Sequence, residues 1–135
     1  MTRFLAEHQV NDCNQKIQIE VADAPGSGNA SHRYDITGFD TASNPSAESS
    51  DGYKSNFSRC ILLFQNGPIG EVGTNGITHE VLLAIVADRL RSFQSGPYAC
   101  RENRIALTQI EEAMHWLSHR TSARLRRGVE GTHAV

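Results

Sequence analysis

The sequence predicts an α+β fold, in which a small N-terminal antiparallel β-sheet is followed by a C-terminal αα-hairpin. Three observations support this prediction. Apolar and polar residues alternate over the first half of the chain, which is typical of half-buried strands. Apolar residues recur at intervals of three and four over the second half, which indicates amphipathic helices. A turn at Gly96 and Pro97 separates the two helical stretches, so the helices are expected to be antiparallel neighbours.

Three strands are expected in the first half, over residues 16–23, 32–40 and 59–65. Ile17, Ile19 and Val21 share one face of the first strand, and Tyr34 and Ile36 share one face of the second. The third strand is a short apolar run, which is compatible with a central strand.

Two different connections join these strands. Residues 24–29 (APGSGN) are rich in turn-forming residues, whereas residues 41–56 form a long polar loop. Long loops in compact domains tend to be functional or mobile, so the second connection is of interest for function.

Four glycines spaced by three follow the strands, at positions 67, 70, 73 and 76. The segment has neither the P-loop pattern nor G-x-G-x-x-G, so it carries no nucleotide-binding fingerprint. One interpretation is a hinge between sheet and helices. The alternative is that its free backbone N–H groups approach an anion at the start of the next helix.

Two long helices are expected after this segment. Thr78 is well placed to cap the first, from His79 to about Phe93, and the second runs from about Cys100 to Arg126, before Gly128. The apolar face of the first comprises Val81, Leu82, Ile85, Val86 and Leu90, and the stripe of the second, interpreted as core, comprises Ala106, Ile110, Ala113, Met114 and Leu117.

The predicted organisation is therefore a β-rich domain (1–67), a glycine-rich connector (68–77), and a helical hairpin with a C-terminal tail (78–135). A small sheet cannot bury every apolar face of such a hairpin. We therefore expect the hairpin to mediate self-association, with two hairpins forming a four-helix arrangement about a two-fold axis.

Charge is unevenly distributed along the 135 residues. The net charge of −2 argues against a general nucleic-acid binder, yet residues 73–135 contain eight arginines, no lysine and six acidic residues. Arg120, Arg124 and Arg127 lie on one side of the second helix near its end. They either complement the helix dipole or bind phosphate, which the planar guanidinium recognises well.

Neither catalysis nor metal binding is expected. Cys13, Cys60 and Cys100 are far apart, which suggests reduced thiols in a cytoplasmic protein, and no secretion signal or membrane-spanning run is evident. Cys100 could serve as a nucleophile, but no local signature supports this. Glu111, His115 and His119 have the spacing of a metal stripe, but eight residues separate the outer pair, so a solvated helix face is expected.

The turn between the helices has the residues of half a nucleotide pocket. Phe93 offers an aromatic platform for a base, and Asn103 offers a donor and an acceptor. Seventeen residues separate Asn103 from Arg120, which is roughly 25 Å along one helix. One compact ligand can contact both only if Arg120 and Arg124 come from an antiparallel second subunit.

Long stretches of the second half resemble the helical hairpin of small phage sponge proteins, which inhibit bacterial cyclic-nucleotide defences. These stretches are TNGITHEVLLAIVADRLRSFQSGPYACREN, ALTQIEEAMHWLSHRT and the ending RRGVEGTH. The hairpin is similar to that of both the anti-CBASS sponges and the Thoeris anti-defence family. The β-rich half, with GFDTASNPS and FQNG, resembles only the latter family.

The resemblance implies a non-enzymatic protein without cofactor. In the cytoplasm of the infected host, it would sequester a cyclic ADP-ribose isomer made by a TIR-domain enzyme and leave it intact. The residues that match the family's pocket are Phe93 and Asn103 from one subunit, with Arg120 and Arg124 from the other. The family assembles as dimers, which in some members build a hexamer.

Some relatives also bind cyclic di- or trinucleotides in separate pockets. Asn75, Gly76 and Thr78, at the glycine-rich entry to the first helix, are the candidates for such a second site.

Two other functions remain open from the residues themselves. A nucleic-acid-binding regulator would use the arginine-rich end of the hairpin and bind with steep salt dependence. A hydrolase that degrades the signal would depend on Cys100 or on a metal ion.

Overall fold

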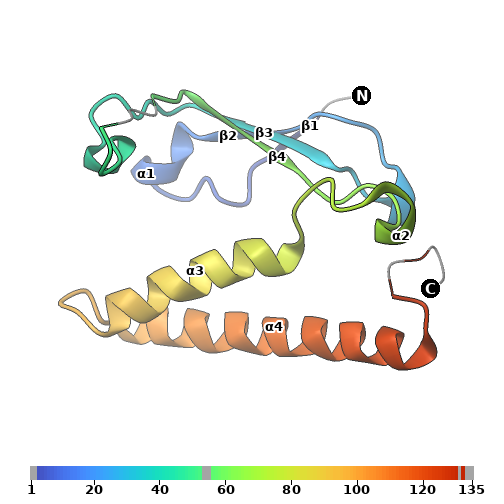
Figure 1. The fold of residues 1–135 in the computed structure, drawn as a ribbon. Helices are drawn as coiled ribbons and strands as arrows, with labels where there is room; N and C mark the ends of the chain where they lie inside the picture. Colours follow the sequence, from blue (N-terminus) through green and yellow to red (C-terminus); the bar gives the residue numbers. More distant parts are fainter. Residues whose placement is uncertain (1–2, 53–55, 131, 133–135) are drawn as a thin grey trace. The chain divides into compact units, whose positions relative to one another are not determined.

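The computed structural model describes residues 3–52, 56–130 and 132. The chain forms two compact units, residues 1–66 and residues 67–135. The first unit contains a β-sheet and the second contains a helical hairpin, which confirms the predicted α+β class (Figure 1).

The sheet has four antiparallel strands in the order β1-β2-β3-β4, so each strand pairs with its neighbour in sequence. The strands are β1 (Arg3–Leu5), β2 (Gln18–Val21), β3 (Arg33–Thr37) and β4 (Arg59–Leu63), and a short helix, α1 (Asp12–Gln15), lies between β1 and β2. The last three strands were predicted, although β4 lies at an edge of the sheet and not at its centre as its apolar run suggested. Strand β1 was not, because three residues are too few to show an alternation.

The predicted alternation identifies the apolar face of the sheet. Val21 is opposite Tyr34 and Ile19 is opposite Ile36, while Tyr34 is also opposite Leu62 on β4. Val21 is only 1% exposed, and the other four are half-buried. Cross-strand pairs of this kind stabilise a sheet through contact between neighbouring side chains.

The backbone passes very close to itself where β3 ends. Gly38 has a φ of +91°, and a Cβ atom at this position would lie 1.8 Å from the carbonyl oxygen of Lys16. Only glycine fits both the conformation and the space. Gly38 therefore allows the chain to leave β3 beside the start of β2.

The loop predicted over residues 41–56 is closed at its base. The backbone N–H of Thr41 donates to the carbonyl of Phe57, whose own N–H donates to the Thr41 hydroxyl at 2.6 Å. The loop contains a 3₁₀ turn (Pro45–Ala47) capped by the side chain of Asn44. Residues 53–55 of this loop lie outside the described part of the chain.

The second unit contains three helices: α2 (Ile69–Val72), α3 (His79–Gln94) and α4 (Arg101–Arg127). The predicted ends of the two long helices are correct to within one residue. Thr78 caps α3 by accepting a hydrogen bond from the N–H of Val81, and Gly128 ends α4 with a φ of +72°. Residues 131 and 133 of the ending RRGVEGTH lie outside the described residues.

The glycine-rich segment has a local structural role. It contains α2, which was not predicted because four residues are too short to show a helical period. Gly67 precedes this helix with a φ of +101°, and Gly73 ends it with a φ of +72°. Two of the four regularly spaced glycines are thus needed for backbone conformation.

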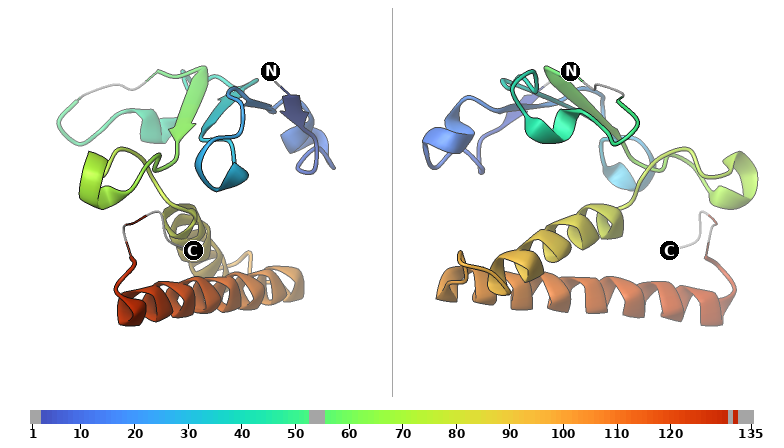
Figure 2. Two further views of the ribbon diagram at one scale, coloured as in Figure 1. Left: turned by 90° about the vertical axis from the view of Figure 1, so that its right-hand side faces the viewer. Right: turned by 60° about the vertical axis from the view of Figure 1, so that its left-hand side comes forward.

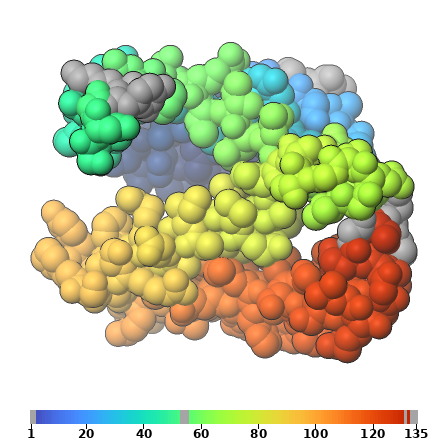
Figure 3. Space-filling view, in the orientation of Figure 1, coloured from blue at the N-terminus to red at the C-terminus, as the bar shows by residue number. Residues whose placement is uncertain are grey.

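Helices α3 and α4 pack against each other from the connecting turn, and Figure 3 shows their side chains in contact there. Away from the turn the two helix axes diverge (Figures 1 and 2). The half-buried stripe of α4 includes Leu107, Ile110, Met114 and Leu117. Ala106 and Ala113, predicted in this stripe, are exposed because they lie at its edge on the helical wheel.

Much of the apolar surface of the hairpin is exposed in the single chain. On α3 only Ala87 is buried, whereas Val81, Ile85 and Val86 are 43%, 55% and 42% exposed. On α4, Trp116 is 60% exposed. The predicted apolar face of α3 is therefore partly open in the single chain, while its Leu82 and Leu90 are half-buried. Among the described helices, none is long and apolar enough to cross a membrane.

Candidate functional site

The turn between α3 and α4 is closed by side chains as well as by backbone bonds. The side-chain oxygen of Gln94 accepts a hydrogen bond of 3.0 Å from the backbone N–H of Cys100. The sulfur of Cys100 in turn accepts from the backbone N–H of Asn103 at 3.4 Å, and so caps α4. These contacts tie the end of α3 to the first turn of α4, so Phe93 and Asn103 lie at the same end of the hairpin.

The Phe93 ring is partly open to solvent, with the residue 37% exposed. The guanidinium carbon of Arg89 lies 5.4 Å from its ring centroid. The ring of Tyr98 meets it edge-on at 6.3 Å, and Tyr98 is itself 74% exposed. Arg89, Phe93 and Tyr98 are called the Phe93 cluster below. An accessible aromatic ring beside a cation is suited to binding a planar, negatively charged molecule.

The two arginines of the expected pocket, Arg120 and Arg124, differ in their surroundings. Arg120 is exposed, and within the described part of the chain it forms no ion pair. Arg124 is only 8% exposed; its Nη2 donates to the carbonyls of Val129 and Thr132, and its Nε lies 3.3 Å from the Glu130 carboxylate. A ligand phosphate at Arg124 would have to share that guanidinium with Glu130.

One chain does not bring the four predicted pocket residues together. Asn103 and Arg120 are seventeen residues apart on the continuous helix α4, roughly 25 Å, so the two halves lie far apart (Figure 1). A single compact ligand therefore cannot contact both ends of α4 within one chain. The shared pocket across two subunits stays a prediction.

The second candidate site lies just before α3. The hydroxyl of Thr78 is used as the helix cap, at 3.4 Å from the N–H of Val81. Asn75 is exposed and Gly76 is half-buried. A ligand role for these three residues remains a prediction.

The stripe considered for metal binding is engaged in other contacts. The Glu111 carboxylate accepts a hydrogen bond of 3.0 Å from Arg91 on α3. The rings of His115 and His119 flank Trp116 edge-on, at 5.4 and 5.7 Å. Among the residues that the structure describes, no group of three or more metal-ligating side chains is found.

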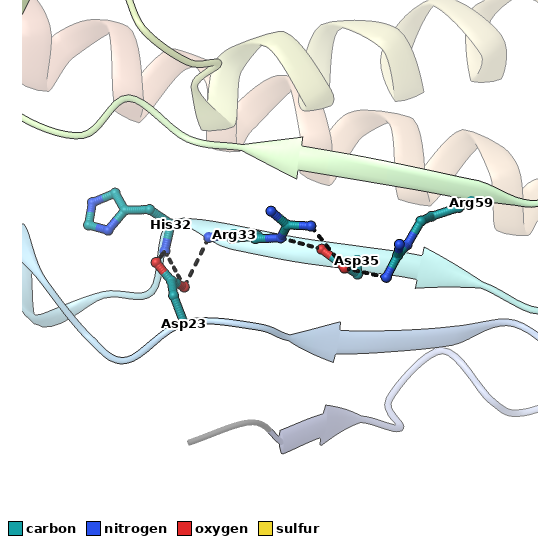
Figure 4. Close-up of polar contacts among 5 residues, drawn as sticks. All are labelled: Asp23, His32, Arg33, Asp35 and Arg59. Atoms are coloured by element: carbon teal, nitrogen blue, oxygen red, sulfur yellow. Dashed lines mark hydrogen bonds and ion pairs between the residues drawn. The ribbon is translucent and has the colours of Figure 1, made fainter.

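A charged cluster on the sheet was not predicted from the sequence (Figure 4). Asp35 on β3 is 4% exposed and accepts hydrogen bonds from Arg33 at 2.8 Å and from Arg59 at 3.0 Å. Asp23, before the β2–β3 loop, accepts from the backbone N–H groups of Arg33 and His32, each at 3.0 Å. Both carboxylates connect neighbouring strands, so we assign them to the stability of the sheet.

The pKa values of both carboxyl groups are lowered. Hydrogen bonding from the Arg33 side chain is the main cause for the pKa of Asp35, and hydrogen bonding from the Arg33 backbone is the main cause for the pKa of Asp23. A lowered pKa means that the folded state favours the ionised carboxylate. The stabilisation is therefore present above the ordinary pKa of 3.8 and is lost as the pH falls through the lowered value.

We expect Asp35→Asn to destabilise the sheet at pH 7 and to have less effect in acid. At low pH the wild-type carboxyl is protonated, so it resembles the neutral amide of the variant. Urea unfolding of both proteins between pH 7 and pH 2.5, followed by the amide signals of β2 and β3, measures this. A difference in stability that is constant over the whole range would contradict the assigned role of the charge.

Three contacts around the candidate site were not predicted from the sequence. Arg89 lies four residues before Phe93 on α3, a spacing that could have indicated their contact. Glu130 could have been considered as a partner for Arg124, since an unpaired cluster of arginines favours a nearby carboxylate. The contact between Gln94 and Cys100 depends on the path of the turn, for which the sequence has no signal.

Comparison with known families finds a match in the helical part of the chain. Residues 61–122 match the family model described as the Acb2/Tad1 hairpin domain. The match begins in β4 and ends within α4, and it includes Phe93, Asn103 and Arg120. Arg124 lies just beyond it.

A relative from a Bacillus phage matches part of the chain. This protein, Thoeris anti-defense 1 of Bacillus phage SBSphiJ7, is 53% identical over 70 residues. The aligned region covers 52% of this chain and 49% of the phage protein. The chain therefore matches about half the length of this curated relative.

Proposed function

Because residues 61–122 of this chain match the model of the Acb2/Tad1 hairpin domain, we propose that the protein is a phage anti-defence protein that sequesters a nucleotide second messenger. The observation that carries the proposal is that the matched segment includes Phe93, Asn103 and Arg120. These residues have the chemistry that a nucleotide requires, namely a stacking surface, a hydrogen-bonding amide and a cation for phosphate.

The proposed signal is the cyclic ADP-ribose isomer made by a TIR-domain enzyme. The similarity to Thoeris anti-defense 1 supports this choice over other nucleotides. Phe93 stacks on the base, Asn103 hydrogen-bonds to the base edge or ribose, and Arg120 and Arg124 bind the phosphates. Capture in the cytoplasm of the infected host keeps the downstream Thoeris effector inactive. Cyclic di- and trinucleotides are the proposed ligands of a second site at Asn75, Gly76 and Thr78.

The pocket is proposed to form between two subunits. The exposed apolar residues of the hairpin, among them Val81, Ile85 and Trp116, support a homodimer in which this surface is covered. Three such dimers would make the hexamer. An antiparallel arrangement places Arg120 of the partner subunit beside the turn that holds Phe93 and Asn103.

The protein is proposed to bind the signal without changing it. Cys100 is the residue considered as a nucleophile, and its sulfur accepts the capping hydrogen bond of α4. Equilibrium dialysis of the purified protein against the cyclic ADP-ribose isomer tests the proposal. One ligand is expected to be retained per subunit, with the total amount of intact ligand unchanged. A total ligand concentration on the protein side no higher than on the protein-free side would refute it.

Phe93→Ala is expected to weaken capture of the ADP-ribose isomer. Loss of aromatic stacking costs about 1–3 kcal/mol, which is roughly a 5- to 150-fold increase in Kd. Titration calorimetry measures the change. Phe4→Ala is the matched control, because Phe4 is 63% exposed but lies on β1 in the sheet unit. Equal affinities of the Phe93 variant and the wild type would remove Phe93 from the site.

A further inference from the structure

Arg89 and Arg91 lie on the same helix but have different partners. Arg91 forms an ion pair with Glu111 at 3.0 Å. Arg89 instead rests on the ring of Phe93, with its guanidinium carbon 5.4 Å from the ring centroid. Within the described part of the chain, no carboxylate pairs with Arg89. Its charge is therefore balanced only by the weak attraction of an aromatic face.

This position places an available cation directly at the stacking surface. Four residues separate Arg89 from Phe93, so both side chains project from one side of α3. Tyr98 borders the same ring at 6.3 Å on its edge. The Phe93 cluster thus combines two aromatic rings and one guanidinium in the half of the pocket that a single subunit supplies.

A nucleotide base competes with Arg89 for the ring. Stacking of a base on an aromatic ring is stronger than an exposed cation–π contact, so the base displaces the guanidinium from the ring face. The displaced group stays on its helix next to the ligand. Phosphate is the preferred partner of a free guanidinium, since it accepts two parallel charge-assisted hydrogen bonds.

We propose that Arg89 is a phosphate-binding residue of the nucleotide pocket, and that it rests on Phe93 only while the pocket is empty. This inference rests on the proposed function, because it adds a residue to the same site. With Arg89 in this role, each of the two subunits that form the pocket contributes a cation. The phosphates of the ligand are then held by Arg89 from one subunit and by Arg120 from the other.

Titration calorimetry with the TIR-derived cyclic ADP-ribose isomer tests the proposal on the 135-residue chain. Arg89→Ala is expected to raise Kd by about 10- to 100-fold, the loss typical of hydrogen bonds to a charged group. The Kd of Arg89→Lys is expected to lie between those of the wild type and Arg89→Ala, because lysine keeps the charge but lacks the planar guanidinium. Arg91→Ala is the matched control and is expected to bind like the wild type.

The salt dependence separates a phosphate contact from a structural role. Binding by the wild type is expected to weaken as salt is raised from 50 to 500 mM, because salt screens charge interactions, and Arg89→Ala is expected to show a smaller decrease. An Arg89→Ala variant with wild-type affinity, or with weaker affinity but an unchanged salt dependence, would overturn the proposal. No binding by the wild-type protein would instead refute the proposed function, and the assignment of Arg89 with it.

Discussion

Arg120→Ala is expected to lose at least about 100-fold in affinity for the ADP-ribose isomer, because it removes charge-assisted hydrogen bonds to a phosphate. Arg120 is exposed and has no ion pair in the described part of the chain, so its removal leaves no buried charge behind. The variant is therefore expected to keep its fold and its helix content. Affinity is measured by calorimetry, and fold by circular dichroism.

Mixing two defective variants tests whether the pocket is shared. In a mixed dimer of Arg120→Ala and Phe93→Ala, one pocket receives both substitutions and the other receives neither. If subunits exchange at random, about a quarter of all pockets are intact, and that fraction binds with wild-type affinity. The two variants are mixed, unfolded in urea and refolded together before titration. Each variant treated alone is the control.

The outcome decides between two arrangements of the site. Recovered binding in the mixture shows that Phe93 and Arg120 act from different subunits. A mixture that binds no better than its components, while the refolded wild type binds normally, would place the complete pocket within one subunit. That result would contradict the roughly 25 Å that separates the two ends along α4.

Gly38→Ala is expected to have the largest effect on stability. Its φ of +91° is unfavourable for any residue with a Cβ, and the added Cβ would lie 1.8 Å from the Lys16 carbonyl oxygen. Backbone strain alone costs about 1–3 kcal/mol, and relieving the clash requires β2 and β3 to move apart. We expect a loss of at least about 3 kcal/mol in the free energy of unfolding of the sheet.

Gly28→Ala is the control for this prediction. Gly28 has a similar φ of +71°, but a Cβ there would meet no atom within 4 Å. Gly28→Ala is therefore expected to lower the free energy of unfolding only by the cost of a left-handed backbone conformation, about 1–2 kcal/mol. Urea unfolding followed by the amide signals of β2 and β3 measures both variants. Equal losses in the free energy of unfolding for the Gly38 and Gly28 variants would show that the added Cβ at position 38 avoids the Lys16 carbonyl oxygen without cost.

The features that could be predicted from the sequence are those that depend on residues close together along the chain. The ends of α3 and α4 could be predicted because a threonine cap and a terminal glycine have fixed roles at helix ends. The sheet could be predicted because Ile19, Val21, Tyr34 and Ile36 alternate with polar residues. Elements of three or four residues, such as β1 and α2, are too short for either signal.

The surroundings of individual side chains were harder to predict. The packing of the apolar faces of α3 and α4 depends on tertiary contacts, and Ala113 was assigned to the core although it is exposed. The grouping of Phe93 with Asn103 could be foreseen, because only a short turn separates their helices. The arginine cluster near the end of α4 favours a nearby carboxylate, but the position of Glu130 beside Arg124 depends on how the chain folds back after Gly128.

The protein is proposed to capture a nucleotide signal and to release it unchanged. The most direct test incubates purified protein separately with the TIR-derived cyclic ADP-ribose isomer and with cyclic di- and trinucleotides. Unbound ligand is removed by filtration, the retained protein is heated, and the released molecules are identified by mass. Intact ADP-ribose isomer in the released fraction is the predicted result. Release of a cleaved product, or retention of no nucleotide at all, would contradict the proposed function.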